Sequence, residues 1–78
     1  MRIIEIRPTK QFGGSWIAFE APGVAPAFPG PNGKQAAIDY ACQRFGGSRG
    51  EIHVYDDAGE NIVAKIPMDD RIKYPHGQ

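Results

Sequence analysis

This chain has few of the residues that small proteins use for cross-links, metal sites or catalysis. Its 78 residues include a single cysteine, Cys42, and two histidines, His53 and His76. One cysteine cannot form an internal disulfide, and a zinc or catalytic site needs three or four converging ligands. The composition therefore predicts no metal, no cofactor and no catalytic residue. A reducing cytoplasm is the expected location.

Long hydrophobic runs and an excess of charge of one sign are also missing. No apolar stretch is long enough to cross a membrane, and residues 1–5 carry no run typical of a signal peptide. Nine basic and nine acidic residues cancel, so no overall field attracts the chain to nucleic acid or to an anionic membrane. We therefore expect a small soluble domain without membrane contact.

The length is that of one small domain. A chain of 78 residues buries only about 60–65% of its unfolded surface, and its core supplies about 3–5 kcal/mol of stability. Association with further copies is a common way for such a domain to become more stable. The apolar patterning indicates a domain over residues 1–67, followed by a polar C-terminal tail over residues 68–78.

The clearest local pattern predicts a helix over residues 32–45. Asn32 is a favourable N-cap residue with Gln35 in the capping-box position, and two glycines follow the last turn. At about 100° per residue, the apolar side chains form one stripe. This stripe consists of Ala37, Ile38, Ala41, Cys42 and Phe45. Its small alanines favour close packing of the helix against a sheet.

Alternating apolar residues predict two strands before this helix and two after it. The first pair spans residues 2–7 and 15–20, and Pro8 is expected to end the first strand. The second pair spans residues 51–56 and 61–67, joined by a turn at Gly59. The residues expected to face the core are Ile4, Ile6, Ile52, Val54, Ile62, Ala64 and Ile66.

A proline-rich segment over residues 21–31 separates the second strand from the helix. It contains four prolines and two glycines. Because proline lacks a backbone N–H, we expect this segment to run extended over the surface, outside any sheet ladder or helix. A connector is favoured over a proline-rich recognition sequence, since such sequences usually lie in disordered regions.

These elements together predict an α+β fold in the order strand–strand–helix–strand–strand. The expected sheet is four-stranded and mostly antiparallel, with one helix packed on one face. The order of the strands does not follow from the pattern.

The second strand has apolar residues on both of its faces. Trp16 and Ala18 point one way, and Ile17 and Phe19 point the other. A sheet covered by a single helix is expected to have one polar face. Either the tail or the proline-rich segment covers the second face, or another molecule does.

The sheet face turned away from the helix is the expected binding surface. It would carry Ile3, Glu5, Arg7, His53, Tyr55, Val63 and Lys65, together with one apolar pair from the second strand. The leading hypothesis is a non-enzymatic interaction module that binds itself or a protein partner there. The residues expected to make this contact are Ile17, Phe19, Tyr55, His53, Arg7 and Lys65.

Two other functions remain open from the residues alone. Aromatic rings beside Arg7 and Lys65 are typical of open sheets that bind single-stranded nucleic acid. A small hydrolase would require a pocket that joins His53 to an acid such as Asp56. The interaction module is favoured over both.

Several short motifs resemble a family of small bacterial domains of unknown function. The motifs are Gly13-Gly14-Ser15-Trp16, Phe28, Ala36-Ala37-Ile38, the strand from Glu51 to Tyr55, and Gly59. The family shows a Gly-Gly-Trp strand, an Ala-Ile helix and a closing hairpin with a glycine turn. The resemblance covers residues 3–65, while residues 21–31 depart from the pattern. The resemblance implies the fold. Because the family has no established activity, it implies no function, partner or catalytic residue for this chain.

Overall fold

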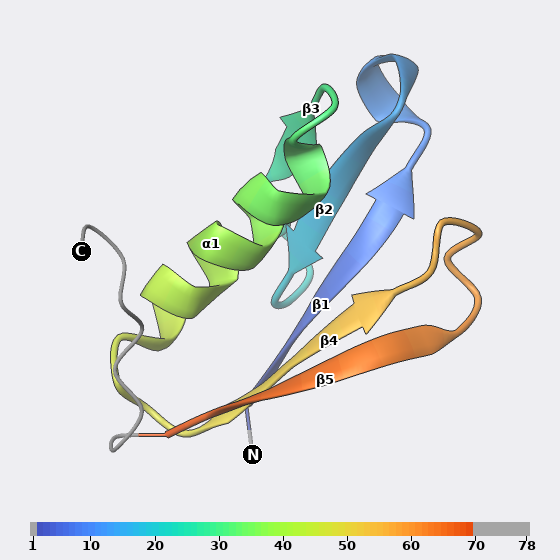
Figure 1. Ribbon diagram of the computed structural model, residues 1–78. Helices are drawn as coiled ribbons and strands as arrows, with labels where there is room; N and C mark the ends of the chain where they lie inside the picture. Colours follow the sequence, from blue (N-terminus) through green and yellow to red (C-terminus); the bar gives the residue numbers. More distant parts are fainter. Residues whose placement is uncertain (1, 70–78) are drawn as a thin grey trace.

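The computed structural model describes residues 2–69, which form one helix packed on one face of a mixed sheet (Figure 1). The strands are β1 (Arg2–Thr9), β2 (Ser15–Phe19), β3 (Ala27–Pro29), β4 (Gly50–Tyr55) and β5 (Ile62–Met68). The helix α1 spans Gly33–Phe45, and a short 3-10 turn, η1, spans Gln11–Gly13. The predicted α+β class is confirmed.

The strands follow the order β3-β2-β1-β4-β5 across a five-stranded sheet. Neighbouring strands run antiparallel except for β1 and β4, which are parallel because α1 crosses between the two halves of the chain. The prediction of four strands was wrong by one strand. The additional strand, β3, comes from the proline-rich segment.

Strand β3 forms although Pro29 is one of its residues and Pro26 directly precedes it. Its residues Ala27, Phe28 and Pro29 pair with Ile17, Trp16 and Ser15 of β2. The carbonyl of Pro26 also accepts a hydrogen bond from the Ala18 amide at 3.1 Å. Prolines still offer carbonyl acceptors, and an edge strand tolerates their missing N–H groups. The expectation that residues 21–31 stay outside the ladder was therefore wrong.

Strand β1 continues past Pro8, contrary to the prediction. Its pairing with β4 ends at Ile6, whereas its pairing with β2 extends to Thr9. At Pro8 the strand thus has a partner on one side only, so the missing proline N–H need not interrupt a ladder.

The predicted helix is confirmed, although its start is not capped in the predicted way. Asn32 occupies the N-cap position without a side-chain hydrogen bond to the backbone. The Gln35 side chain donates to Asp39 Oδ1 at 2.9 Å instead of turning back to the cap. At the other end Gly46 adopts φ 54°, ψ 32°, the left-handed conformation expected after a helix.

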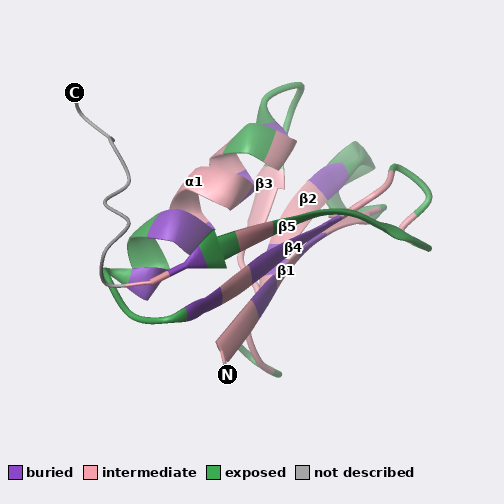
Figure 2. Ribbon diagram, turned by 60° about the horizontal axis from the view of Figure 1, so that its bottom comes forward, coloured by how far each residue is buried: buried purple, intermediate pink, exposed green. Residues whose placement is uncertain are grey.

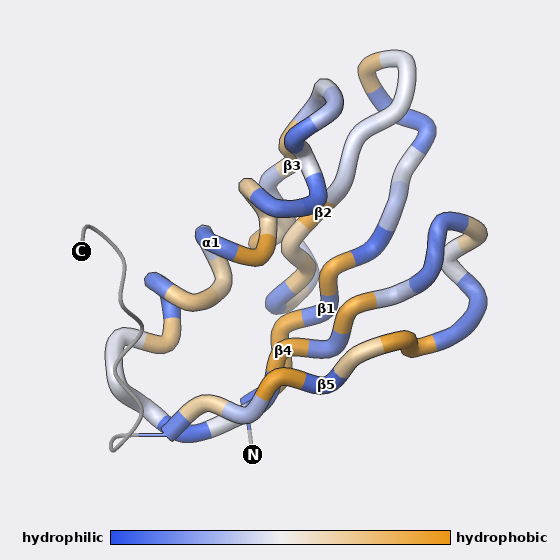
Figure 3. The backbone as a smooth tube through the Cα atoms, in the orientation of Figure 1, coloured by the Kyte–Doolittle hydropathy of each residue, from blue (hydrophilic) through white to orange (hydrophobic). Residues whose placement is uncertain are grey.

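The core lies between α1 and the near face of the sheet. Ile4, Ile6 and Ile52 are fully buried there, as predicted. Helix residues Ala37, Ala41 and Phe45, together with Ala18 and Val54 of the sheet, complete most of this layer. Figure 2 shows the buried stretches of β1, β4 and α1 facing one another, and Figure 3 shows that these stretches are also the apolar ones.

Met68 was assigned to the polar tail but is the last residue of β5 and is 8% exposed. Its partner in the ladder is Gly50, at the start of β4. The rest of the predicted tail, from residue 70 onward, lies outside the described residues.

Candidate interaction surface

One face of the sheet has no helix on it within residues 2–69 (Figures 1 and 2). Helix α1 packs against β2, β3, β1 and β4 on the other side. We call the uncovered side the open face. Strand register places all six predicted contact residues on it: Ile17, Phe19, Tyr55, His53, Arg7 and Lys65.

The two apolar faces of β2 are now assigned. Trp16 packs against the core and Ala18 is fully buried in it, so this pair faces α1. Ile17 lies opposite Arg7, and Phe19 lies opposite Glu5, on the open face. Both apolar side chains are half-buried there, beside the longer charged side chains of β1. Strand β3 lies next to β2 in the sheet and does not cover this face.

A polar network fixes the centre of the open face. Arg7 Nε lies 2.9 Å from Glu5 Oε1, and the Arg7 guanidinium lies 4.6 Å from the centre of the Tyr55 ring. The Tyr55 hydroxyl donates to Glu5 Oε2 at 3.3 Å and accepts from Arg7 Nη2 at 3.4 Å. The hydrogen bond with Tyr55 and the charge of Glu5 raise the pKa of Arg7 above its ordinary value. The cation on this face is thereby held in place and partly neutralised.

His53 occupies the middle of the same face, between Glu5 of β1 and Lys65 of β5 in the register. It is only 9% exposed, and its Nε2 lies 2.8 Å from Glu51 Oε1. Over residues 2–69, no group of three or more His, Cys, Asp or Glu side chains is placed to hold a metal ion. The arrangement gives His53 a carboxylate partner on its own strand and no further ligand-forming group.

Asp56, the acid considered for a hydrolase, is engaged in the turn between β4 and β5. Its carboxylate accepts hydrogen bonds from the Glu60 amide at 3.0 Å and from Asn61 Nδ2 at 3.2 Å. The bond from the Glu60 backbone lowers the pKa of Asp56 below its ordinary value. The geometry gives Asp56 a role in closing the turn.

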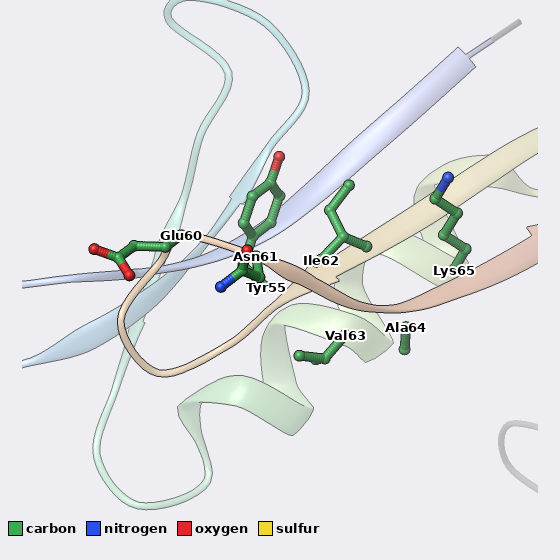
Figure 4. Close-up of a pocket in the computed structure, with 7 residues that line it drawn as sticks. All are labelled: Tyr55, Glu60, Asn61, Ile62, Val63, Ala64 and Lys65. Carbon is green, nitrogen blue, oxygen red and sulfur yellow. The ribbon is translucent and has the colours of Figure 1, made fainter.

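The last strand departs from the predicted alternation because it contains a β-bulge. Val54 pairs with Ala64 and Tyr55 pairs with Ile62, so Val63 is an extra residue between them. Ile62 and Lys65 therefore point to the open face with Tyr55, while Val63 and Ala64 point to the opposite side (Figure 4). The predictions that Ile62 faces the core and that Val63 lies on the open face were wrong.

Strand β5 is the most exposed apolar segment of the sheet. Ile62 is 40% exposed and Val63 is 58% exposed, and Ala64 is exposed as well. The strand borders an open hollow lined by Tyr55 and residues 60–65 (Figure 4). Of the residues that line it, Tyr55 and Lys65 were predicted contact residues, whereas the exposed Ile62 and Val63 were not. The signal was the unbroken apolar run Ile62-Val63-Ala64 directly after a turn, which a half-buried alternating strand does not show.

One further apolar side chain protrudes, at the turn between β1 and β2. Phe12 is 76% exposed and adopts φ 56°, ψ 36°, a left-handed conformation that is rare for a bulky residue. The Ser15 hydroxyl and the Gly14 amide both donate to the Gln11 carbonyl at 3.0 Å, which holds this turn in shape.

Within residues 2–69, α1 is neither long nor apolar enough to cross a bilayer. No family model, no curated protein and no solved structure matches this chain. The resemblance to a family of small bacterial domains therefore stays a prediction, and the case for function depends on the geometry alone.

Proposed function

We propose that this chain is a non-enzymatic interaction module that associates with a second copy of itself through the uncovered apolar surface of its sheet. The observation that carries the proposal is the one-sided cover of the sheet. Helix α1 covers one face, while Ile17 and Phe19 on the open face and Ile62 and Val63 on β5 have no element over them in the described part of the chain. Apolar groups in such a position favour association.

The charges are compatible with a second copy as the partner. Nine basic and nine acidic residues give the chain no net charge, so two copies do not repel one another at long range. The open face itself combines Arg7 and Lys65 with Glu5 and Glu51. A surface that carries both signs can complement its own copy. A domain of this size also gains stability from association.

Binding of single-stranded nucleic acid is less well supported by the same geometry. The guanidinium of Arg7 lies over the Tyr55 ring and beside Glu5, so it occupies a ring face that a base would need. Glu5 and Glu51 add negative charge to the face that would meet phosphate groups.

The test is the native mass by light scattering over protein concentrations from about 1 μM to about 1 mM. The proposal expects the mass to rise from the 8.5 kDa of one chain to twice that value. A constant mass of one chain over the whole series would refute it. Titration with mixed single-stranded oligonucleotides at two salt concentrations tests the other function, which predicts binding that weakens as salt is added.

A further inference from the structure

We infer that two copies join along the outer edges of their β5 strands and form one continuous sheet. This inference rests on the proposed function and names the surface that performs it. The side chains of β5 that meet at this seam are Ile62, Val63, Ala64 and Lys65.

The two edges of the sheet differ in their capacity to pair. At one edge, β3 has three residues, and Pro26 and Pro29 lie within or directly beside it. Short edge strands with prolines resist pairing with another chain. At the other edge, β5 has seven residues, and no strand of the described chain pairs with its outer side. Its one proline, Pro67, lies next to its last residue, so the stretch from Ile62 to Ile66 is free of proline. Of the two edges, only β5 presents a row of main-chain groups long enough for a partner strand.

The side chains of β5 are exposed on both sides of the sheet. Ile62 is 40% exposed on the open face, and Val63 is 58% exposed on the side of α1. Helix α1 packs on β2, β3, β1 and β4, which leaves the start of β5 bare on its own side as well (Figure 2). A strand added beside β5 would contact both groups at once, whereas a partner lying on the open face would reach only Ile62.

The bulge suits an antiparallel pairing of β5 with its copy. Side chains alternate in a regular strand, but Val63 and Ala64 point to the same side (Figure 4). A two-fold axis between these two residues sets Val63 opposite Ala64 of the second copy, and Ile62 opposite Lys65, each pair on one side of the sheet. Glu60 then lies diagonally across from Lys65 of the second copy, within reach of an ion pair.

This geometry limits the assembly to two copies. A two-fold contact uses the same patch on both chains, so it closes on itself. The remaining edges of the joined sheet are both β3, which resist further pairing for the reason given above. Continued growth would bring β3 of one dimer against β3 of another, and the prolines at β3 oppose it.

A specific contact has to bury only a modest share of the surface of this chain. A specific interface needs about 500 Å² from each partner, which is about a tenth of the 5096 Å² surface of this chain. Strand β5 supplies seven residues, of which five are exposed. The two open faces become neighbours in one sheet, so Tyr55, Arg7 and Lys65 of both copies line a single surface.

The deciding variant is Val63→Asp, which places a charge beside the proposed axis. The control is Phe12→Asp, which makes the same kind of change at a side chain that is 76% exposed on the β1–β2 turn. Light scattering is expected to show a dimer dissociation constant raised at least about tenfold for Val63→Asp and unchanged for Phe12→Asp. Far-ultraviolet circular dichroism establishes that both variants are folded.

The outcomes separate this inference from the proposed function. A monomeric wild-type chain overturns both. A dimer that withstands Val63→Asp but is lost in the double variant Ile17→Ser, Phe19→Ser overturns only the β5 seam and leaves self-association in place. A dimer that withstands all of these changes also overturns the seam.

A cross-link gives a second readout that does not depend on loss of assembly. The two Val63 residues flank the proposed axis, one residue apart along the strands, so their Cα atoms lie about 6 Å apart, a separation that a disulfide can span. Val63→Cys is expected to give a covalent dimer on mild oxidation, and Phe12→Cys is expected to remain monomeric on a denaturing gel. The native Cys42, at 5% exposure, sets the background in the unmodified chain. Equal cross-linking of both variants would contradict the seam.

Discussion

At Gly33 helix α1 lies directly against the backbone of Phe28 in β3, and replacement of this glycine by alanine tests the packing. A Cβ atom added at Gly33 would lie 2.1 Å from the Phe28 carbonyl oxygen and 3.7 Å from Cδ1 of Trp16. Ordinary van der Waals contact begins near 3.5 Å, so the carbonyl and the helix would have to separate by more than about 1 Å. The obstacle is backbone and cannot move aside by changing a rotamer.

Two effects of opposite sign decide the outcome. Alanine favours helix over glycine by up to about 1 kcal/mol, and less at the first helical position. Overpacking a fitted contact costs about 1–3 kcal/mol. The contact is expected to dominate, so the Gly33→Ala variant loses about 1–2 kcal/mol. For a domain of this size the loss lowers the Tm by roughly 5–15 °C.

The assay is thermal unfolding followed by circular dichroism, with Gln35→Ala as the control. Gln35 lies in the same helical turn but is exposed, so its replacement should change stability by less than about 0.5 kcal/mol. A Tm for Gly33→Ala equal to or above that of the wild type would refute the close approach of α1 to β3.

Two further perturbations have signs fixed by the geometry. Phe12→Gly should raise the free energy of unfolding by about 1 kcal/mol, because Phe12 holds a left-handed φ of 56°, which glycine adopts without strain, and its side chain is 76% exposed. A lower free energy of unfolding in a urea titration would contradict this strain. The Glu60 amide lowers the pKa of Asp56 below its ordinary 3.8, so Asp56 stabilises the fold above about pH 3.8, and this contribution is lost as the pH falls through the lowered pKa. Asp56→Asn should therefore lose less stability than the wild type between about pH 7 and about pH 2 in urea titrations, and equal losses would show that the turn does not contribute.

The difference between the two halves of the sheet explains how much of the candidate site was predictable. Residues on β1 and β4 alternate regularly, so their faces followed from the sequence. The two apolar pairs of β2 alternate as well, but only the structure shows that Ile17 and Phe19 lie on the open face. The bulge at Val63 depends on how β5 meets Tyr55 and the turn that Asp56 closes. A single inserted residue changes which faces the residues on its two sides share, here those of Ile62 and Val63, and a strand pattern alone does not reveal it.

The conformation of residues 21–31 shows a second limit of local reasoning. Their prolines exclude hydrogen-bond donors at four positions but leave the carbonyls available, and β2 supplies the donors. Whether such a segment becomes an edge strand depends on the partner beside it. That partner is β2, and the residues of the proline-rich segment do not themselves show that β2 lies beside them.

The sequence by itself determined the α+β class, the bounds of the helix and the core residues Ile4, Ile6, Ile52 and Val54. These follow from local periodicity, because residues repeated at the period of a helix or strand share a face. The tertiary structure alone decided the parallel pairing of β1 with β4, the edge positions of β3 and β5, and the exposure of Ile62 and Val63. Those features depend on contacts between distant segments, and on where one helix of thirteen residues leaves a five-stranded sheet uncovered.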